Sequence, residues 1–297
     1  MAPRSGRRVL FVNPKAGEGK AGRVNLVAEC LSRGIVPVVM MPGDDVRALA
    51  SAEVTAGAEV IGMAGGDGSQ SAVAAAAAAG DVPFVCVPAG TRNHFAADIG
   101  LDRRDVVGAL DAFGNPVERR IDLASVNGRD YLNAASLGLY GRIVQSPQYR
   151  EEKAQTVVEL LPGMLGPGSE PFDLRFMGPD GATWEGAHVL LVSNNPYGPV
   201  TLGGQGTRSR MDSGLLGVIA AVFRVPDEMA AVIAAERAGA IQHLAPVRAW
   251  TTPRLRVDSG GPVEIALDGE AAVMDPPLLF ESRPGALRMR LPPRRGR

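Results

Sequence analysis

The sequence predicts an α/β protein, with a doubly wound α/β domain in the N-terminal half and a mostly antiparallel β domain in the C-terminal half. Through about residue 120, short apolar runs alternate with helical patterns, which is typical of parallel βαβ units. Beyond Arg120, strand-like runs follow one another with turn residues between them and few helical stretches. The 297 residues, 45% of them hydrophobic, suffice for two domains with buried cores.

The predicted α/β domain, residues 1–120, alternates strands with helices. The expected strands are 9–12, 35–41, 60–64 and 82–87, and the expected helices are 22–33, 43–56, 71–79 and 105–113. Ligands of open α/β sheets bind outside the carboxyl ends of the strands. We therefore expect the loops 13–22, 65–69 and 88–93 to line one crevice.

The central stretch runs from Val60 to Gln70, an apolar run that ends in Gly65-Gly66-Asp67-Gly68. The alanine-rich segment 71–79 that follows favours a helix, so the glycine turn opens onto a helix N-terminus. Backbone N–H groups and the helix dipole at such a turn suit a phosphate. Asp67 would repel a bare phosphate, but a divalent cation would bridge the two. The alternative is a plain βα turn in which Asp67 only caps the helix.

The second half, residues 121–279, is the predicted β domain. Residues 121–126 and 129–135 flank Asn127-Gly128, which supplies the positive φ values of a type I′ hairpin turn. Further expected strands are 172–177, 188–192, 215–222, 255–257, 263–267 and 287–291, and the expected helices are 151–161 and 227–238.

The composition of the chain argues against several classes of protein. A formal net charge of −1 gives no basic field for nucleic acid, and Cys30 and Cys86 in apolar contexts indicate reduced core thiols. No apolar run approaches the roughly 18 residues of a membrane span, and the arginine-bearing N-terminus lacks the long apolar segment of a signal peptide. We expect a soluble cytoplasmic protein.

The sequence does not match the nucleotide-binding motifs of other protein classes in full. The segment 17–22 fits G-x-G-x-x-G, but the next strand ends in Met40-Met41 where an acid should hold the ribose. As a Walker loop it lacks the first glycine and the Ser or Thr that binds magnesium. The three histidines lie too far apart in sequence for a zinc site, and no G-x-S-x-G elbow occurs.

Four motifs together resemble the diacylglycerol kinase catalytic family, which includes sphingosine kinases and bacterial lipid kinases. In order and spacing they are 13–17 (NPKAG), 65–69 (GGDGS), 88–93 (PAGTRN) and 268–270 (DGE), and the similarity covers almost the whole chain. The Gly-Gly-Asp-Gly motif also occurs in NAD kinases and 6-phosphofructokinases. The resemblance implies nucleotide in the α/β domain, lipid in a cleft against the β domain, and a chain end, about 280–297, that returns to the first domain.

The resemblance also implies roles for single residues. ATP would be bound by Asn13, Lys15, Gly65, Gly66, Asp67, Gly68, Ser69, Thr91 and Asn93. Asp67 would act in catalysis with the magnesium that accompanies ATP, and Glu270 would be the general base that accepts the proton of a lipid hydroxyl. On spacing alone, 268–270 also fits a β-turn between two strands.

This chain departs from the family pattern at several positions. Ser69-Gln70-Ser71-Ala72 replaces the commoner run after Gly68, Arg92 and His94 replace a glycine and an acid, and Met41 or Pro42 replaces a threonine. Relatives hold a structural magnesium with an aspartate where this chain has Ser213. Asp212 is the remaining candidate ligand, and we expect the second magnesium site to be lost or weak.

The resulting prediction is an ATP- and Mg²⁺-dependent kinase of a lipid hydroxyl, with diacylglycerol as the first choice of acceptor. A kinase for a soluble acceptor such as NAD, and a noncatalytic nucleotide or lipid sensor, stay open, as do nucleotide preference and a homodimer. Peripheral contact with an anionic inner membrane face would use arginines near the two chain ends, namely Arg4, Arg7, Arg8, Arg288, Arg290, Arg294, Arg295 and Arg297.

Overall fold

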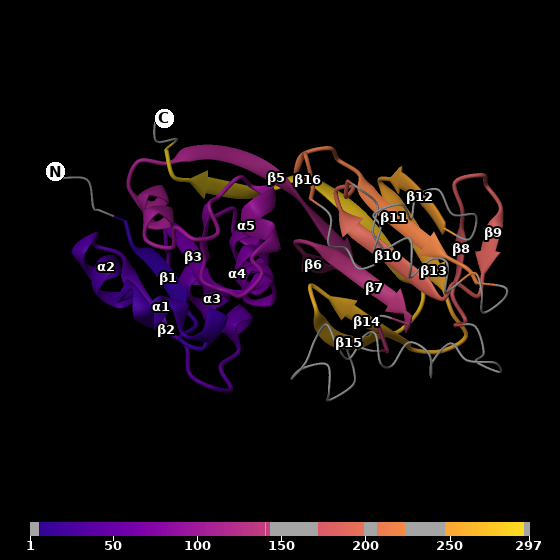
Figure 1. Cartoon of the computed structure of the whole chain (residues 1–297), viewed down its shortest axis with the longest axis horizontal. Helices are drawn as coiled ribbons and strands as arrows, with labels where there is room; N and C mark the ends of the chain where they lie inside the picture. Colours follow the sequence, from indigo (N-terminus) through magenta and orange to yellow (C-terminus); the bar gives the residue numbers. More distant parts are fainter. Residues whose placement is uncertain are drawn as a thin grey trace. The chain divides into compact units, whose positions relative to one another are not determined.

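The computed structural model describes residues 6–139, 141–142, 172–198, 207–223, 228 and 247–293. It contains two compact units (Figure 1). Unit 1 is Met1–Leu123 with Pro284–Arg297, and unit 2 is Ala124–Arg283. Unit 1 is an α/β structure with a mostly parallel sheet, and unit 2 contains an antiparallel sheet, so the predicted fold class is confirmed.

The sheet of unit 1 has the strand order β2-β1-β3-β4-β16. All neighbouring pairs in this row are parallel. Its strands are β1 (Arg8–Val12), β2 (Val36–Val39), β3 (Val60–Gly65), β4 (Phe84–Pro88) and the last part of β16 (Leu278–Leu291). The carboxyl ends of β1, β3 and β4 therefore open at one edge, as the loop positions predicted.

The helices of unit 1 differ from the prediction in their ends. They are α1 (Lys20–Arg23), α2 (Leu26–Ser32), α3 (Val46–Thr55), α4 (Asp67–Ala79) and α5 (His94–Asp98), with 3-10 turns η1 (Ala16–Glu18) and η2 (Gly108–Phe113). The single helix expected over 22–33 is broken because Asn25 takes a left-handed φ of 48°. The helix expected over 105–113 is only a 3-10 turn, and α5 was not predicted.

Helix α4 begins four residues earlier than predicted, because Asp67, Gly68 and Ser69 form its first turn rather than a preceding loop. Gly66 is its N-cap in an extended conformation, with no side-chain capping hydrogen bond. Alanines along this helix are buried, among them Ala74 and Ala77 with 0% exposure, and their small side chains let the helix lie close to β3.

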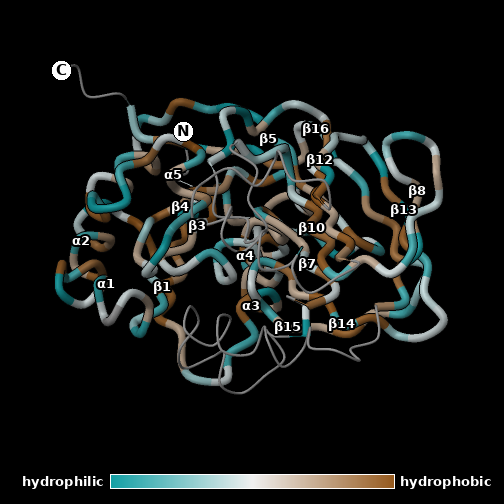
Figure 2. The backbone as a smooth tube through the Cα atoms, turned by 45° about the vertical axis from the view of Figure 1, so that its right-hand side comes forward, coloured by the Kyte–Doolittle hydropathy of each residue, from teal (hydrophilic) through white to brown (hydrophobic). Residues whose placement is uncertain are grey.

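Unit 2 contains a six-stranded antiparallel sheet in the order β12-β11-β10-β7-β14-β15. Its strands are β7 (Ala134–Gly138), β10 (Val189–Asn194), β11 (Leu216–Ala221), β12 (Val247–Thr252), β14 (Val263–Leu267) and β15 (Glu270–Met274). Figure 2 shows hydrophobic colour along β10, whose six residues are all buried. Strands β12 and β15 are the two edges of this sheet.

The remaining strands of unit 2 belong to the same sheet as β16. They are β5 (Val117–Val126), β6 (Arg129–Tyr131), β8 (Arg175–Met177), β9 (Thr183–Glu185) and β13 (Arg254–Asp258), with β5 and β16 contributing residues to both units. In this sheet β13 and β5 pair with β16, β8 and β9 follow β13, and β6 pairs with β5. The helices expected over 151–161 and 227–238 lie outside the described residues, apart from residue 228. Strands β9, β12 and β15 were not predicted.

The hairpin at Asn127-Gly128 is present, with φ values of 47° and 78°. The strand expected over 129–135 is divided, however, because β6 ends at Tyr131 and β7 begins at Ala134 in the other sheet. The two residues between them, Leu132 and Asn133, carry the chain from one sheet to the next. This crossing segment lies beside the Asp268 turn.

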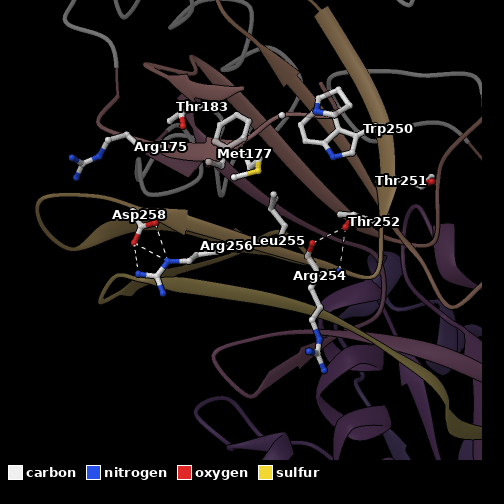
Figure 3. Close-up of a pocket in the computed structure, with 13 residues that line it drawn as sticks. Arg175, Met177, Thr183, Trp250, Thr251, Thr252, Arg254, Leu255, Arg256 and Asp258 are labelled. Atoms are coloured by element: carbon white, nitrogen blue, oxygen red, sulfur yellow. Dashed lines mark hydrogen bonds and ion pairs between the residues drawn. The ribbon is translucent and has the colours of Figure 1, made fainter. Parts of the chain in front are cut away.

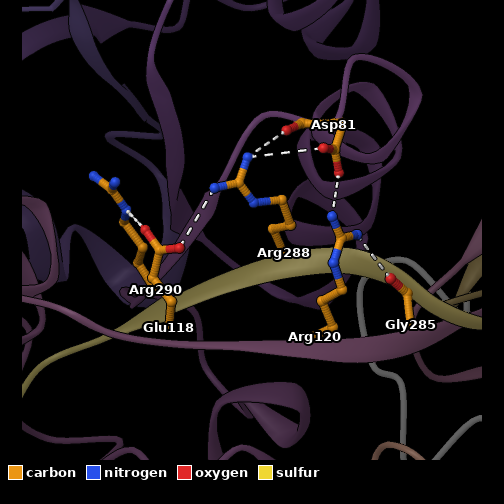
Figure 4. A network of polar contacts seen from close by, with 6 residues as sticks. All are labelled: Asp81, Glu118, Arg120, Gly285, Arg288 and Arg290. Carbon is orange, nitrogen blue, oxygen red and sulfur yellow. Dashed lines mark hydrogen bonds and ion pairs between the residues drawn. The ribbon is translucent and has the colours of Figure 1, made fainter.

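The returning end of β16 is held to unit 1 by charged side chains as well as by strand pairing. Figure 4 shows Arg290 and Arg288 on either side of Glu118, with Nε of Arg290 2.7 Å from Oε1 of Glu118. Arg288 also donates to the Asp81 carbonyl oxygen, and Arg120 pairs with the Asp81 carboxylate and donates to the Gly285 carbonyl.

Candidate active site

The three predicted loops of unit 1 meet through their backbones. The Asn13 N–H donates to the carbonyl of Ala64, at the end of β3. A Cβ added at Gly17 would lie 2.4 Å from the Ala89 carbonyl oxygen, and one added at Gly90 would lie 2.4 Å from the Gly66 Cα. The glycines are therefore required by close backbone approach, and the loops 13–22, 65–69 and 88–93 form one surface.

Asp67 joins the second loop to the third. Its two carboxylate oxygens accept the backbone N–H groups of His94 and Phe95, at 3.2 and 3.1 Å. These are the first two residues of α5, where N–H groups have no partner within the helix. Asp67 thus caps α5 and not its own helix, so the alternative in which it caps the helix that follows it is wrong. Each carboxylate oxygen keeps a second lone pair for a cation or a proton.

The third loop is shaped from within by Asn93. Its amide oxygen accepts the Gly90 N–H at 2.9 Å, and its amide nitrogen donates to the carbonyls of Gly90 and Pro88 at 2.8 and 3.2 Å. The side chain is buried, with 4% exposure, and the residue has a φ of 54°. Thr91, in the same loop, is exposed.

The first loop exposes Lys15, and the Asn13 side chain bonds back to the backbone of the same loop. The Asn13 amide oxygen accepts the Lys15 N–H at 3.0 Å, which closes the turn after β1. Lys20 reaches across to the third loop, where its ammonium donates to the Pro88 carbonyl at 3.0 Å, and it also donates to the Arg103 carbonyl at 2.6 Å. Partial burial lowers the pKa of Lys20. Sequence reasoning assigned Lys20 no role because its carbonyl partners lie more than 60 residues away.

Gln70 is a further residue that motif reasoning missed. Its amide nitrogen donates to the carbonyls of Met63, Gly65 and Val87 at 2.9, 3.3 and 3.0 Å, so it ties the ends of β3 and β4 together. The side chain is 2% exposed, and its Oε1 is buried with no hydrogen-bond partner among the described residues. The sequence feature that could have pointed to Gln70 is its position in the run after Gly68, where the chain departs from the family pattern.

The Asp268-Gly269 pair in unit 2 is the two-residue turn between β14 and β15. Both residues have positive φ, 50° and 83°, and Glu270 pairs across the turn with Leu267. The β-turn expected from spacing is therefore present. Glu270 is exposed at the first position of β15, whereas the Asp268 carboxylate is turned inward onto the segment between β6 and β7.

That inward carboxylate belongs to a buried polar cluster. Asp268 accepts the N–H groups of Leu132, Asn133 and Ala134, and Arg208 donates to the Leu132 carbonyl and the Asn133 amide oxygen. Tyr131 is 1% exposed, and burial, with Asp268 and Tyr197 close by, raises its pKa well above the ordinary value. Sequence patterns do not indicate this cluster, because its members lie up to 137 residues apart, from Tyr131 to Asp268.

The comparisons with known proteins decide the family. The model of the diacylglycerol kinase catalytic domain matches residues 7–126. A protein named "Probable lipid kinase YegS-like" from Pseudomonas aeruginosa (strain UCBPP-PA14) is 31% identical over 84% of this chain and 82% of its own length. The chain belongs to the diacylglycerol kinase catalytic domain family.

Two further proteins are similar to this chain, one over part of its sequence and one in its fold. A protein named "Diacylglycerol kinase" from Mycobacterium tuberculosis (strain CDC 1551 / Oshkosh) is 31% identical over 41% of this chain and 40% of its own length. A solved structure from Bacillus anthracis str. Sterne has a TM-score of 0.75 over 97% of this chain and 96% of that chain, at 19% identity, and so supports the fold alone.

The turn expected to hold a second cation in the diacylglycerol kinase family is organised here by hydrogen bonds. The Ser213 hydroxyl and N–H both donate to the Asn195 amide oxygen, at 2.5 and 2.9 Å. Asp212 forms an exposed ion pair with Arg210 at 3.0 Å. Within the described part of the chain, no group of three or more His, Cys, Asp or Glu residues is placed to hold a metal ion.

Among the arginines expected to contact a membrane, the four that the structure describes are engaged within unit 1. Arg7 pairs with Glu53, Arg8 donates to the Phe113 and Arg33 carbonyls, and Arg288 and Arg290 belong to the network around Glu118. Arg4, Arg294, Arg295 and Arg297 lie outside the described residues. No helix among those described has both the length and the apolar character that crossing a membrane requires.

A cavity of about 530 Å³ in unit 2 lies along β8, β12 and β13. Figure 3 shows Trp250, Met177 and Leu255 among its lining residues, with the Arg256 guanidinium folded back onto Asp258. Strand β12 is the sheet edge opposite to β15, which carries Glu270. This cavity is therefore separate from the Asp268–Glu270 turn, and at least one of its arginines is neutralised by an acid.

Both cysteines are buried and free of disulfide bonds, as expected. Burial raises the pKa of Cys30 to about 11 and that of Cys86 well above its ordinary value. Neither thiol is a nucleophile at neutral pH, because the thiolate is the reactive form.

Proposed function

We propose that this chain is an ATP-dependent kinase that phosphorylates a lipid hydroxyl, with diacylglycerol as the acceptor and phosphatidic acid as the product. The observation that carries the proposal is the convergence of three glycine loops in a member of the diacylglycerol kinase catalytic domain family. The names of the Pseudomonas and Mycobacterium relatives support a lipid acceptor.

The loops of unit 1 fit the phosphates of ATP. Gly17, Gly66 and Gly90 keep this surface free of side chains, and the N-terminus of the 13-residue helix α4 opens onto it. Backbone N–H groups at such a terminus stabilise negative charge. Gly65, Gly68, Ser69, Thr91, Asn13 and Lys15 complete the proposed nucleotide side, with Asn93 holding the third loop in shape.

Magnesium fits this site as a companion of ATP. Mg²⁺ commonly binds one or two carboxylates together with substrate phosphates, and Asp67 is a carboxylate at the glycine loops. When bound, the ion neutralises charge on the phosphates during transfer. We assign no magnesium to Asp212, since its carboxylate pairs with Arg210 and the neighbouring Ser213 is committed to Asn195.

Glu270 is the proposed general base. An alkyl hydroxyl is a poor nucleophile, so a carboxylate within hydrogen-bond reach assists by accepting its proton. Glu270 is exposed and follows a turn that is fixed by its neighbour Asp268. An accessible carboxylate on a rigid turn suits proton transfer from a bound substrate, because a small displacement of a catalytic group is costly in rate.

The acceptor is tested with radiolabelled ATP and purified diacylglycerol, with phosphatidylglycerol, a sphingoid base and NAD as parallel acceptors. We expect label in phosphatidic acid and its loss when magnesium is chelated. Transfer to NAD alone would assign the chain to the soluble-acceptor class. Nucleotide binding without transfer to any acceptor would make it a sensor and would contradict the proposal.

Glu270→Gln tests the base. We expect kcat to fall by about 10²- to 10⁴-fold while the KM for ATP stays close to that of the wild type, because a base acts in the chemical step. Glu264→Gln, on the other strand of the same hairpin, is the matched control and should retain activity, since Glu264 pairs with Arg142 at the surface. A collapse of ATP affinity at unchanged kcat would make Glu270 a binding residue.

A further inference from the structure

The crossing segment Leu132–Asn133 and the next residue, Ala134, are held from two sides by opposite charges. On one side, the Asp268 carboxylate accepts all three of their N–H groups, at 2.8, 2.7 and 3.0 Å. On the other side, Arg208 donates to the Leu132 carbonyl at 2.6 Å and to the Asn133 amide oxygen at 2.7 Å. Arg208 is only 2% exposed, so this cation acts inside the protein.

A single peptide group connects the two charges. The carbonyl of Leu132 and the N–H of Asn133 belong to one peptide plane, so its oxygen faces Arg208 and its N–H faces Asp268. Hydrogen bonds in such a chain polarise one another, and both are charge-assisted. Arg208 and Asp268 are thereby coupled through the peptide between them.

The coupling also depends on the shape of the Arg208 guanidinium, because its two terminal nitrogens donate to different acceptors. One nitrogen of Arg208 serves the carbonyls of Leu132 and Asn194, at 2.6 and 2.9 Å, and the other serves the Asn133 side chain. The Tyr197 ring lies 5.2 Å from the guanidinium carbon and packs against the same group. A lysine keeps the charge but lacks the planar pair of donors.

Asp268 connects the crossing segment to Glu270, the proposed base. Its own N–H donates to the Ala134 carbonyl at 3.0 Å, and its left-handed φ of 50° sets the direction of the turn. Only Gly269 separates Asp268 from Glu270, which pairs with Leu267 to close the hairpin. A shift of the crossing segment therefore shifts the start of β15.

We propose that Arg208 is a positioning residue for Glu270, acting through the Leu132–Asn133 peptide and Asp268. This inference rests on the proposed function, in which Glu270 is the base. Arg208 contributes by fixing where Glu270 stands, so its loss lowers the rate of transfer without weakening the nucleotide site of unit 1.

The test is a double-mutant cycle with Arg208→Lys and Glu270→Gln, measured as kcat and as KM for ATP on the lipid acceptor. We expect Arg208→Lys alone to lower kcat on the order of 10- to 10²-fold, the size associated with a small misplacement. In the Glu270→Gln background the same change should alter kcat by no more than about twofold, since groups that act as a unit are not additive. Arg210→Lys, two residues along and exposed, is the control that should leave kcat unchanged.

Two outcomes of the cycle separate this inference from the function it rests on. Equal losses from Arg208→Lys in both backgrounds, or a raised KM for ATP at unchanged kcat, would overturn the positioning role. A Glu270→Gln variant with wild-type kcat would instead overturn the base assignment, and the contact itself would then be judged by hydrogen exchange.

Hydrogen exchange of the Leu132–Ala134 amides gives a readout that requires no turnover. We expect faster exchange in Arg208→Lys than in Arg210→Lys, because the peptide that faces Asp268 loses its second anchor. If Arg208→Lys does not fold, Asn133→Ala removes one Arg208 contact while keeping the backbone N–H, and it should give the same direction of change in exchange and kcat. Unchanged exchange in the folded variant would contradict the proposal.

Discussion

Asp67 combines a structural contact with its proposed role in transfer. Its two oxygens satisfy the N–H groups of His94 and Phe95, so Asp67→Asn leaves one of these groups without an acceptor. We expect the free energy of unfolding to fall by about 1–3 kcal/mol, as for a hydrogen bond to a charged group. Turnover should fall on the order of 10²-fold through the loss of charge at the phosphates.

Urea unfolding and steady-state kinetics separate the two effects of Asp67→Asn. Asp44→Asn is the matched control, since Asp44 accepts a single N–H, that of Met41, at an exposed turn. The control should retain its activity. A folded Asp67→Asn variant with wild-type turnover would remove this carboxylate from the mechanism and leave it only the capping of α5.

At the scale of elements, the ion pairs around Glu118 tie β16 to β5. Hydrogen bonding to Arg290, with further attraction from Arg288, lowers the pKa of Glu118. A lowered folded pKa stabilises the native state above the unfolded value of about 4.3, and this contribution disappears as pH falls through the folded pKa. Glu118 is 42% exposed, so solvent screening limits the contribution to less than about 1 kcal/mol.

Glu118→Gln measures this contribution directly. At pH 7 and low salt we expect a loss of less than about 1 kcal/mol in the free energy of unfolding relative to the wild type. The difference should shrink toward zero below the folded pKa of Glu118, and also at about 1 M salt, where charges are screened within a few ångströms. A difference that persists once Glu118 is protonated would attribute the effect to packing instead of charge.

At the scale of the whole molecule, the last strand completes unit 1. Leu287 and Met289 have 0% exposure, and β16 covers the edge of β4. A chain that ends at Arg283 loses both side chains, each worth about 2–5 kcal/mol, against a total stability of about 5–15 kcal/mol. It also leaves β4 with an unpaired edge, which favours aggregation.

We expect the chain shortened at Arg283 to lose the cooperative unfolding of unit 1, seen by thermal melting monitored by circular dichroism. A chain shortened at Pro293 keeps β16 and should match the full chain within about 0.5 kcal/mol. If the shorter variant melts like the full chain, the returning strand is dispensable for unit 1 and the role assigned to Leu287 and Met289 is wrong.

The sequence alone determined the features that depend on neighbouring residues. Alternating apolar and helical patterns predicted the strands of unit 1, and Asn127-Gly128 predicted the β5–β6 hairpin because only a few residue types accept positive φ at both turn positions. The family motifs then indicated the glycine loops. Element ends were less certain, as the early start of α4 and the break at Asn25 show, because these depend on capping and packing from elsewhere in the fold.

Only the tertiary structure decided which distant groups meet. Asp67 caps α5, Gln70 ties β3 to β4, and Arg208 reaches Asp268 through a peptide more than 70 residues earlier in the chain. A hydrogen bond requires two groups within about 3 Å, and sequence spacing does not specify that distance once the partners belong to different elements. The division of 129–135 between two sheets follows from the same cause, since the partners of Leu132 and Asn133 are brought to them by folding.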